Sequence, residues 1–462
     1  MSQPLGGLAK KEVPPLASIA KPAVARGHAI AAPLGRVRWT ICFVLFLAAT
    51  INYVDRHVIA LLKPLLARDF QVGDVAYAHV ITAFQIAYAL GMLAMGRVLD
   101  AIGTRRGFAL AATIWGVAAM GHALVASALG FAMARLALGF GEAGMFPAAV
   151  KTIAEWFPRK ERALATGLFN AGTTVGAIVT PLVVPPIVAA SGPRVAFLLT
   201  GALALSWVAL WLGVYAPAQE HPRVTARELE HIRSGPVEVS APVPWRVLLG
   251  RRQLWAFAAG KLLTDPFWWL YLFWVPDFLH REHGLELGQM AVPLASIYLL
   301  SGAGSVAGGW LSSHLLARGF SVNRARKTAM LVFAALVAPI ALAARAESPW
   351  TAALCIGLAT AGHQGFSANL FTLASDLFPE RAVGSAVGLG GMAGAVSGVI
   401  LAEVVGRVLQ RSGSYGVLFV LPPLAYVAAI GVIQLLSPRL EPLRGADLPA
   451  VERSPGSVGE RS

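Results

Sequence analysis

Five ionisable residues stand within otherwise apolar stretches of the chain: Asp55, Arg56, Arg135, Glu142 and Lys261. If these stretches cross a bilayer, each charge at mid-membrane costs roughly 2.5–3.5 kcal/mol. Five charges without partners would cost on the order of 10–15 kcal/mol, which is comparable to the stability of a whole domain. We therefore expect these side chains to face a polar cavity and to pair with one another. In such a cavity the acids could take up and release protons, and the neighbouring cations could bind an organic anion. The transport of a proton and of an organic anion would then be coupled.

The spacing of these residues predicts where each one points. Arg135 and Glu142 are seven positions apart, so they project from the same face of a helix. Asp55 and Arg56 are adjacent, so their side chains diverge by about 100° and cannot face the same partner. We expect Arg56 to point into the cavity and Asp55 to point toward the helix of Arg135 and Glu142. Protonating Asp55 or Glu142 would leave a net positive site for an anion, and releasing the proton would expel it. The alternative is that the charged pairs only hold helices together.

Other polar side chains could complete such a cavity. Amides and hydroxyls flanked by aromatic rings are suited to the hydroxyl groups and ring faces of a sugar. Their alternative use is hydrogen bonding between neighbouring helices. The candidates for binding hydroxyl groups are Asn170, Thr173, Lys261, Gln364, Ser367 and Asn369, and Tyr88 is a further polar residue in an apolar stretch.

The composition requires these residues to lie in a membrane. Of the 462 residues, 56% are hydrophobic and only 13% are charged, with a mean hydropathy of +0.64. A soluble domain carries roughly 25% charged residues. The net charge of +14 comes from short, scattered groups of Lys and Arg, which argues against a nucleic-acid-binding face. Cys42 and Cys355 both lie in apolar runs and no cluster of metal ligands occurs in the sequence, so we expect an integral membrane protein without metal or cofactor.

Apolar stretches of about 20 residues are each long enough to cross the bilayer as a helix, and the sequence contains twelve of them. We expect an all-α membrane protein with twelve transmembrane helices in two pseudo-symmetric six-helix bundles. Lys and Arg are concentrated on the side that holds both termini, which predicts that both termini are cytoplasmic. The expected parts are a disordered tail (1–38), an N-terminal bundle (39–215), a cytoplasmic linker (216–252), a C-terminal bundle (253–437) and a second disordered tail (438–462).

The two halves contain a repeat. Residues 156–167 and 377–388 align without gaps at a constant offset, and the pairs include Phe157 with Phe378 and a proline directly after each phenylalanine. Both segments lead into the fifth helix of their own half. A repeated six-helix unit is typical of transporters in which two bundles rock around a site at their interface.

The loop after the second helix carries a longer motif. Residues 96–106 read G-x-x-x-D-x-x-G-x-R-R, a pattern that resembles the signature of the major facilitator superfamily. In the second half Gly309 is present, but Ser313 stands at the position of the acid. The resemblance implies that the motif residues act in conformational gating: Gly96, Asp100, Gly103, Arg105 and Arg106.

A finer resemblance covers residues 40–438. The segment 52–56, which reads Asn-Tyr-Val-Asp-Arg, and the segment 134–147 resemble the first and fourth helices of the anion:cation symporter family. Within that family the chain is most similar to bacterial hexuronate transporters, which move glucuronate and galacturonate. This resemblance implies inward proton symport of a sugar acid anion through a bacterial inner membrane by a monomer whose partners are the substrate, protons and lipid. One departure is Thr174, where hexuronate carriers are expected to have asparagine.

The resemblance also implies roles for single residues. Asp55 and Glu142 would carry the coupled proton, and Arg56, Arg135 and Tyr88 would bind the substrate carboxylate. Thr173 and Asn369 fall on the polar positions of the family's fifth and tenth helices.

Three other functions stay open at this point. The substrate could be another organic anion, such as an aldonate, an aldarate or an aromatic acid, although the amides of the tenth helix favour a hydroxylated one. The protein could be a sensor in the form of a transporter, which would usually carry a sizeable soluble domain. A membrane enzyme is disfavoured because no nucleophile–base pair occurs in the sequence.

Overall fold

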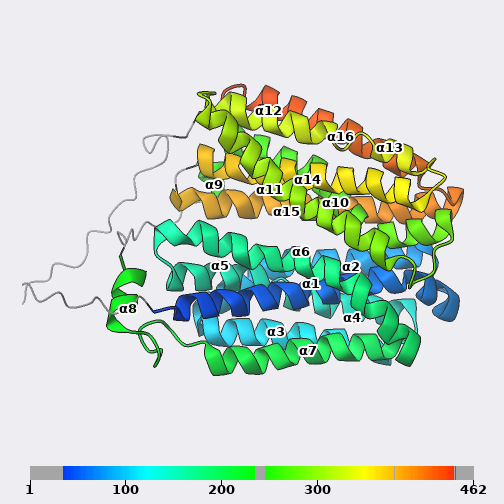
Figure 1. Ribbon diagram of the computed structural model, residues 1–462, viewed down its shortest axis with the longest axis horizontal. Coiled ribbons are helices and arrows are strands. Elements are labelled where there is room, and N and C mark those ends of the chain that lie inside the picture. The colour runs from blue at the N-terminus through cyan, green and yellow to red at the C-terminus, as the bar shows by residue number, and fades with distance from the viewer. Residues whose placement is uncertain (1–34, 235–244, 379, 442, 444–462) are drawn as a thin grey trace, which may run out of the picture.

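The computed structural model describes residues 35–234, 245–378, 380–441 and 443, and within these residues all regular structure is helical. Figure 1 shows two helical bundles lying side by side, with their long helices running in roughly the same direction. The N-terminal bundle contains α1 (Val37–Phe70), α2 (Asp74–Ile102), α3 (Thr104–Gly121) with the short η1 (His122–Leu124), α4 (Ala128–Glu142), α5 (Met145–Trp156), α6 (Arg159–Ser191) and α7 (Pro193–Val214). The C-terminal bundle contains α10 (Arg252–His283), α11 (Ala291–Ala317), α12 (Val322–Ala335), α13 (Ile340–Ala343), α14 (Pro349–Leu377), α15 (Glu380–Ser412) and α16 (Gly416–Leu436).

Two short helices, α8 (Ala226–Ile232) and α9 (Trp245–Leu249), lie between the bundles in sequence. They mark one end of the molecule, which we call the linker end; the opposite end is called the far end (Figure 1). The greater part of both expected tails lies outside the described residues. The described bundles begin at Val37 and Arg252.

Three membrane segments are less apolar than the rest. Among the described residues, nine segments are long and apolar enough to span a bilayer on composition alone. The other three of the twelve are α4 with α5, α10 and α14, which carry Arg135, Glu142, Lys261, Asp265, Gln364 and Asn369, whereas Asp55 and Arg56 lie in α1, which is still among the nine. A bilayer accepts such helices only where their polar faces are turned to other helices or to water.

Glycine decides how closely the site helices can approach one another. A Cβ on Gly139 of α4 would stand 2.3 Å from the carbonyl oxygen of Phe84 on α2. A Cβ on Gly304 of α11 would stand 2.3 Å from the carbonyl oxygen of Ala361 on α14. A side chain at either position would collide with the neighbouring backbone, so the helices can approach this closely only because these residues are glycines. The glycines of these helices therefore set the separation of the helices that carry the polar residues.

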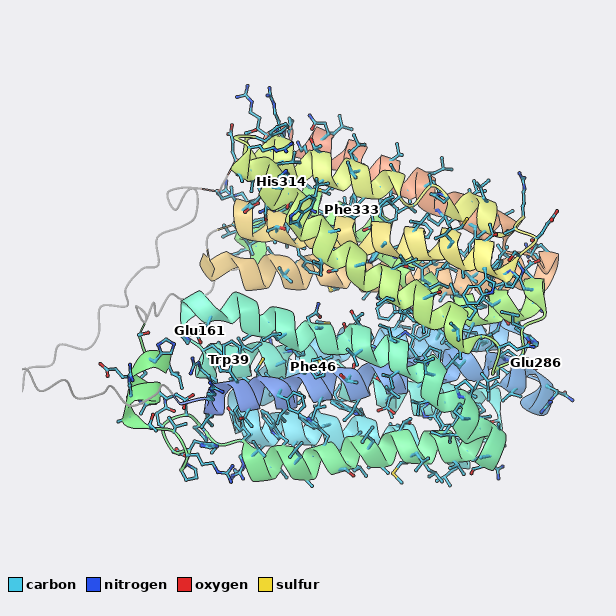
Figure 2. All side chains as sticks on the ribbon, in the orientation of Figure 1. Trp39, Phe46, Glu161, Glu286, His314 and Phe333 are labelled. Atoms are coloured by element: carbon cyan, nitrogen blue, oxygen red, sulfur yellow. The ribbon has the colours of Figure 1, made fainter. Side chains whose placement is uncertain are left out.

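The bundles contact each other from mid-membrane to the far end. Helix α2 packs against α15, α6 against α11 and α1 against α10, and the cross-bundle contacts of α2 lie in its far-end half, for example that of Ala78 with Gly406. Figure 2 shows the bundles spread apart at the linker end, where Trp39 and Glu161 lie, and together toward the far end, where Glu286 lies. The described structure is thus closed at the far end.

Candidate transport site

A small cavity lies where the two bundles meet. Its accessible volume is about 10 Å³ in the described state, and it receives residues from α1 and α6 of the N-terminal bundle and from α10, α11 and α14 of the C-terminal bundle. Hydroxyl, amide and aromatic groups dominate its walls. The lining residues are Tyr53, Thr173, Thr174, Ala177, Trp268, Tyr298, Ser301 and Gln364.

A buried ion pair stands on the N-terminal side of this interface. Nε and NH2 of Arg56 both donate to Oε2 of Glu142, at 2.9 and 2.7 Å, and NH2 also donates to Asn52 at 3.2 Å. Glu142 is the last residue of α4, and Gly139 one turn earlier lets that helix approach α2 closely. The second oxygen of Glu142, Oε1, has no hydrogen-bond partner among the described residues. The pair is formally neutral as it stands, and Oε1 is the carboxylate oxygen that Arg56 leaves unoccupied.

Aromatic rings from both bundles surround the Arg56 guanidinium. Its central carbon lies between 4.8 and 5.8 Å from four ring centroids, distances at which the electron-rich ring faces attract a cation. Three rings come from α1 and α2, and the fourth comes from α10 of the other bundle. The rings are those of Tyr53, Phe84, Tyr88 and Trp269.

Asp55 and Arg135 are not among the residues that line the cavity. The Asp55 carboxyl lies beside Thr200 of α7 and feels the charges of Arg135 and Glu142, and neither of its oxygens has a standard hydrogen-bond partner among the described groups. Arg135 is completely buried, and its Nε and NH1 atoms have no partner within the described part of the chain. The sequence predicts that Asp55 and Arg56 point to different neighbours, and the geometry agrees. Spacing along the chain does not predict the pairing of Glu142 with Arg56, which lies 86 positions away.

The C-terminal bundle contributes a second buried charged pair. The Lys261 ammonium lies 2.6 Å from Oδ2 of Asp265, one turn away on α10, and 4.2 Å from the centroid of the Phe371 ring. One turn further along α10, Trp268 lines the cavity and stacks on His363 of α14. The sequence predicts that Lys261 binds substrate hydroxyls, and in this state Asp265 occupies it.

The remaining polar candidates divide by where their side chains lie. Thr173 and Gln364 line the cavity, and Asn170 is exposed on α6 toward the linker end. Ser367 is buried. The Asn369 amide donates to the carbonyl oxygens of Gly308 at 3.0 Å and of its own helix at 2.9 Å, so it ties α14 to α11.

A charged cluster that the sequence does not predict links the bundles at the far end. Lys63 of α1 lies 2.9 Å from Asp74 of its own bundle and 2.7 Å from Asp277 of α10. Arg281 of α10 lies 2.8 Å from Asp74, and the Tyr415 hydroxyl donates to Asp277. Lys63 is 2% exposed, although its position near the end of an apolar stretch suggests a loop residue. The one signal in the sequence is an aspartate, Asp277, inside the apolar run of α10.

The motif loop lies at the linker end of the N-terminal bundle. Gly103 has a φ of +81° between α2 and α3, a conformation that favours glycine. Arg105 donates to the carbonyl oxygen of Leu212 on α7 in the same bundle, and Arg106 is exposed. Gly96 and Asp100 lie in α2, and the Asp100 side chain is outside the described part of the structure.

Two six-segment bundles that meet around a polar, charged cavity define the class of multi-pass secondary transporters. Residues 45–402 match the model of the Major Facilitator Superfamily. The chain therefore belongs to this superfamily of transporters, with relatives of the anion:cation symporter type, and is not an enzyme.

Known relatives and solved structures agree with this assignment. The chain is 30% identical over 384 residues to a hexuronate transporter of Escherichia coli strain K12, covering 82% of this chain and 89% of the relative. It is 31% identical over 327 residues to a galacturonate transporter of Dickeya chrysanthemi, covering 69% of this chain and 94% of the relative. In fold it is similar to a bacterial homologue of the human lysosomal transporter Spinster in an inward-facing, occupied conformation, with a TM-score of 0.69 at 17% identity, covering 90% of this chain and 99% of that one. The predictions of family and fold class are confirmed.

Proposed function

We propose that the protein is a proton symporter that carries a hexuronate, such as galacturonate or glucuronate, into a bacterial cell across the inner membrane. In this proposal both termini and the linker are cytoplasmic, so the far end is periplasmic and the described state is inward-facing. The observation that carries the proposal is the Arg56–Glu142 pair beside a cavity shared by both bundles. The names of the relatives at 30–31% identity support a sugar acid as the substrate.

The pair provides a way to couple proton and anion. With Glu142 ionised, its carboxylate occupies the guanidinium that a substrate carboxylate would need. A proton on Glu142 removes that charge and leaves Arg56 free for an anion held among the aromatic rings. When the proton leaves, the internal pair re-forms and displaces the substrate. Tyr88 and Arg135 would support the carboxylate site, the first from the ring cluster and the second by its charge beside the Phe84 ring.

The other end of the sugar would face the hydroxyl and amide groups. Thr173 and Gln364 line the cavity from opposite bundles, which allows one substrate to contact both. Asn170, Ser367 and Asn369 lie along the same helices, on the path toward the linker end or behind the cavity wall. The loop with Gly96, Asp100, Gly103, Arg105 and Arg106 would contact the C-terminal bundle when the linker end closes.

A second candidate substrate is an aldarate, which carries a carboxylate at each end. The Lys261–Asp265 pair favours it, because a protonated Asp265 would leave a second cation in the C-terminal bundle. Competition between unlabelled galactarate and labelled galacturonate separates the two candidates: stronger inhibition by galactarate than by unlabelled galacturonate would favour the aldarate.

The test is uptake of labelled galacturonate and glucuronate into proteoliposomes under an inward proton gradient, with and without a protonophore. We expect concentrative uptake that the protonophore abolishes. Uptake that is unaffected by the protonophore would refute proton coupling, and absence of uptake of both sugars would refute the hexuronate.

The matched variants are Glu142→Gln, Arg56→Met and Glu286→Gln. Glu142→Gln keeps the shape of the site but cannot ionise, so accumulation should be lost while exchange of labelled for unlabelled substrate persists. Arg56→Met should lose both, because the cation that binds the carboxylate is gone. Glu286 is exposed at the far end, so its variant should behave as the wild type.

A further inference from the structure

Gln85 of α2 is a buried amide that the proposed coupling of proton and anion does not use. Its side chain lies in the far-end half of the helix and is 1% exposed. Neither Oε1 nor Nε2 has a hydrogen-bond partner among the described residues. A buried polar atom without a partner destabilises the state in which it occurs. The described state therefore carries a cost that a different arrangement of the bundles can remove.

The bundle interface is what deprives Gln85 of partners. The narrow gap beside it is lined by Ile81 of the same helix and otherwise by residues of α10 and α15, which belong to the other bundle. The gap has no volume accessible to water, so water cannot supply the missing bonds. Helix α15 approaches this closely because Gly398 has no side chain: a Cβ there would stand 3.1 Å from Nε2 of Gln85.

Gln85 is also a neighbour of the Arg56 site. Tyr88, one turn away on α2, and Trp269 of α10 are two of the rings that surround the Arg56 guanidinium, and these two rings meet edge to face with centroids 6.4 Å apart. Trp269 lines the same gap as Gln85. Because α2 runs from the far end toward the linker end, Gln85 lies on the far-end side of the guanidinium site.

Opening of the far end changes the surroundings of this amide. In a transporter whose bundles rock against each other, α2 separates from α10 and α15 when the far end opens. The wall that covers Gln85 then moves away, and its amide lines the entrance next to Arg56. An amide group offers two N–H donors and a carbonyl acceptor, which suits a sugar hydroxyl that both donates and accepts.

We propose that Gln85 is a substrate-binding residue of the far-end-open state. Its amide binds a hydroxyl group of the sugar acid whose carboxylate is held at Arg56, and it loses this bond when the far end closes and the gap excludes the sugar. The substrate is then bound more tightly from the far-end side than from the linker-end side. This inference rests on the proposed transport of a sugar acid and adds a residue that acts in one state only.

The first experiment compares the wild type with Gln85→Met, which keeps the length of the side chain and removes its hydrogen-bonding groups. The KM for labelled galacturonate is measured in right-side-out and in inverted membrane vesicles. In Gln85→Met it should rise at least about fivefold from the far-end side, the equivalent of one net hydrogen bond, and should not rise from the linker-end side. The control is Gln410→Met, at an exposed position near the end of α15. An equal change of KM from both sides, or no change from either, would overturn the proposal.

Substrate analogues separate binding from a shift between states. Deoxy analogues of galacturonate, each lacking one ring hydroxyl, compete with labelled galacturonate from the far-end side. The analogue without the hydroxyl that Gln85 binds should compete about fivefold less well than galacturonate in the wild type and equally well in Gln85→Met. A shift in the conformational equilibrium would change all competitors by the same factor. The inference is therefore wrong if every analogue keeps the same ratio to galacturonate in both proteins.

A test of access needs no substrate. Gln85→Cys is treated with a membrane-impermeant maleimide in vesicles of both orientations, and the wild type, whose two native cysteines are buried, sets the background. Position 85 should be labelled from the far-end side alone. Labelling at background level, or equal labelling from both sides, would refute the inference even if galacturonate is transported. If position 85 is labelled as expected but neither galacturonate nor glucuronate is transported, the proposed function fails.

Discussion

The far-end cluster should control which end of the transporter is open, and Lys63→Met tests this. The Lys63 ammonium is shared between carboxylates of the two bundles, at 2.9 Å from Asp74 and 2.7 Å from Asp277. It is also 4.5 Å from the Trp274 ring centroid. Methionine fills a similar volume and removes only the charge. Two carboxylates would then face each other across the interface with Arg281 as their remaining cation.

The size of the effect follows from the burial of the cluster. Removing one partner of a buried ion pair costs about 3–5 kcal/mol. Arg281 stays 2.8 Å from Asp74 and 3.5 Å from Asp277, so we take a lower value of about 2 kcal/mol. In the state in which the far end is open, water reaches both carboxylates and the cost vanishes. The whole penalty therefore falls on the described state, and the equilibrium should shift toward the far-end-open state by about 30-fold.

The shift can be measured as a distance between spin labels. Ala126 of the N-terminal bundle and Gln289 of the C-terminal bundle are exposed at the far end, and the two native cysteines are both buried and can be replaced. Double electron–electron resonance should show a longer distance gaining population in Lys63→Met. The control is Arg345→Met, a change of the same kind at an exposed position of the C-terminal bundle. An unchanged distance distribution in Lys63→Met, or the same change in the control, would refute this reasoning.

Two further predictions concern stability. Partial burial raises the pKa of Glu161, but hydrogen bonds with Arg38 and His231 outweigh it and hold this pKa below the ordinary value of 4.5. The stability that these contacts provide is present above pH 4.5 and is lost as the pH falls through the lower pKa of the folded state. In scanning fluorimetry, the melting temperature of Glu161→Gln should therefore drop less between pH 6 and pH 3 than that of the wild type. An equal drop in the two proteins would contradict the assignment. Gly304→Val should lower the melting temperature by several degrees, because its side chain would meet the α14 backbone at a cost of about 1–3 kcal/mol. Gly309→Ala, at an open position on the same helix, should change it little; equal melting temperatures for the two variants would refute the packing argument.

Much of the architecture is predictable from the amino-acid sequence. A bilayer forces every spanning segment to be a helix with an apolar surface, so runs of apolar residues predict the helices and their repeat predicts two bundles. The same cost of burying charge singles out Arg56, Glu142 and Lys261 as candidate site residues from their positions in the sequence. The divergence of Asp55 from Arg56 also follows from helix geometry, because neighbours on a helix are fixed in relative direction.

Contacts between helices depend on the tertiary structure. Which acid pairs with Arg56 is set by how α1 and α4 are rotated and how closely they approach, and no spacing within one helix contains that information. The same holds for Lys63 and Asp277, which belong to different bundles. Local spacing determines which side chains share a face, whereas the packing of helices far apart in the chain decides which faces meet and which end of the transporter is closed.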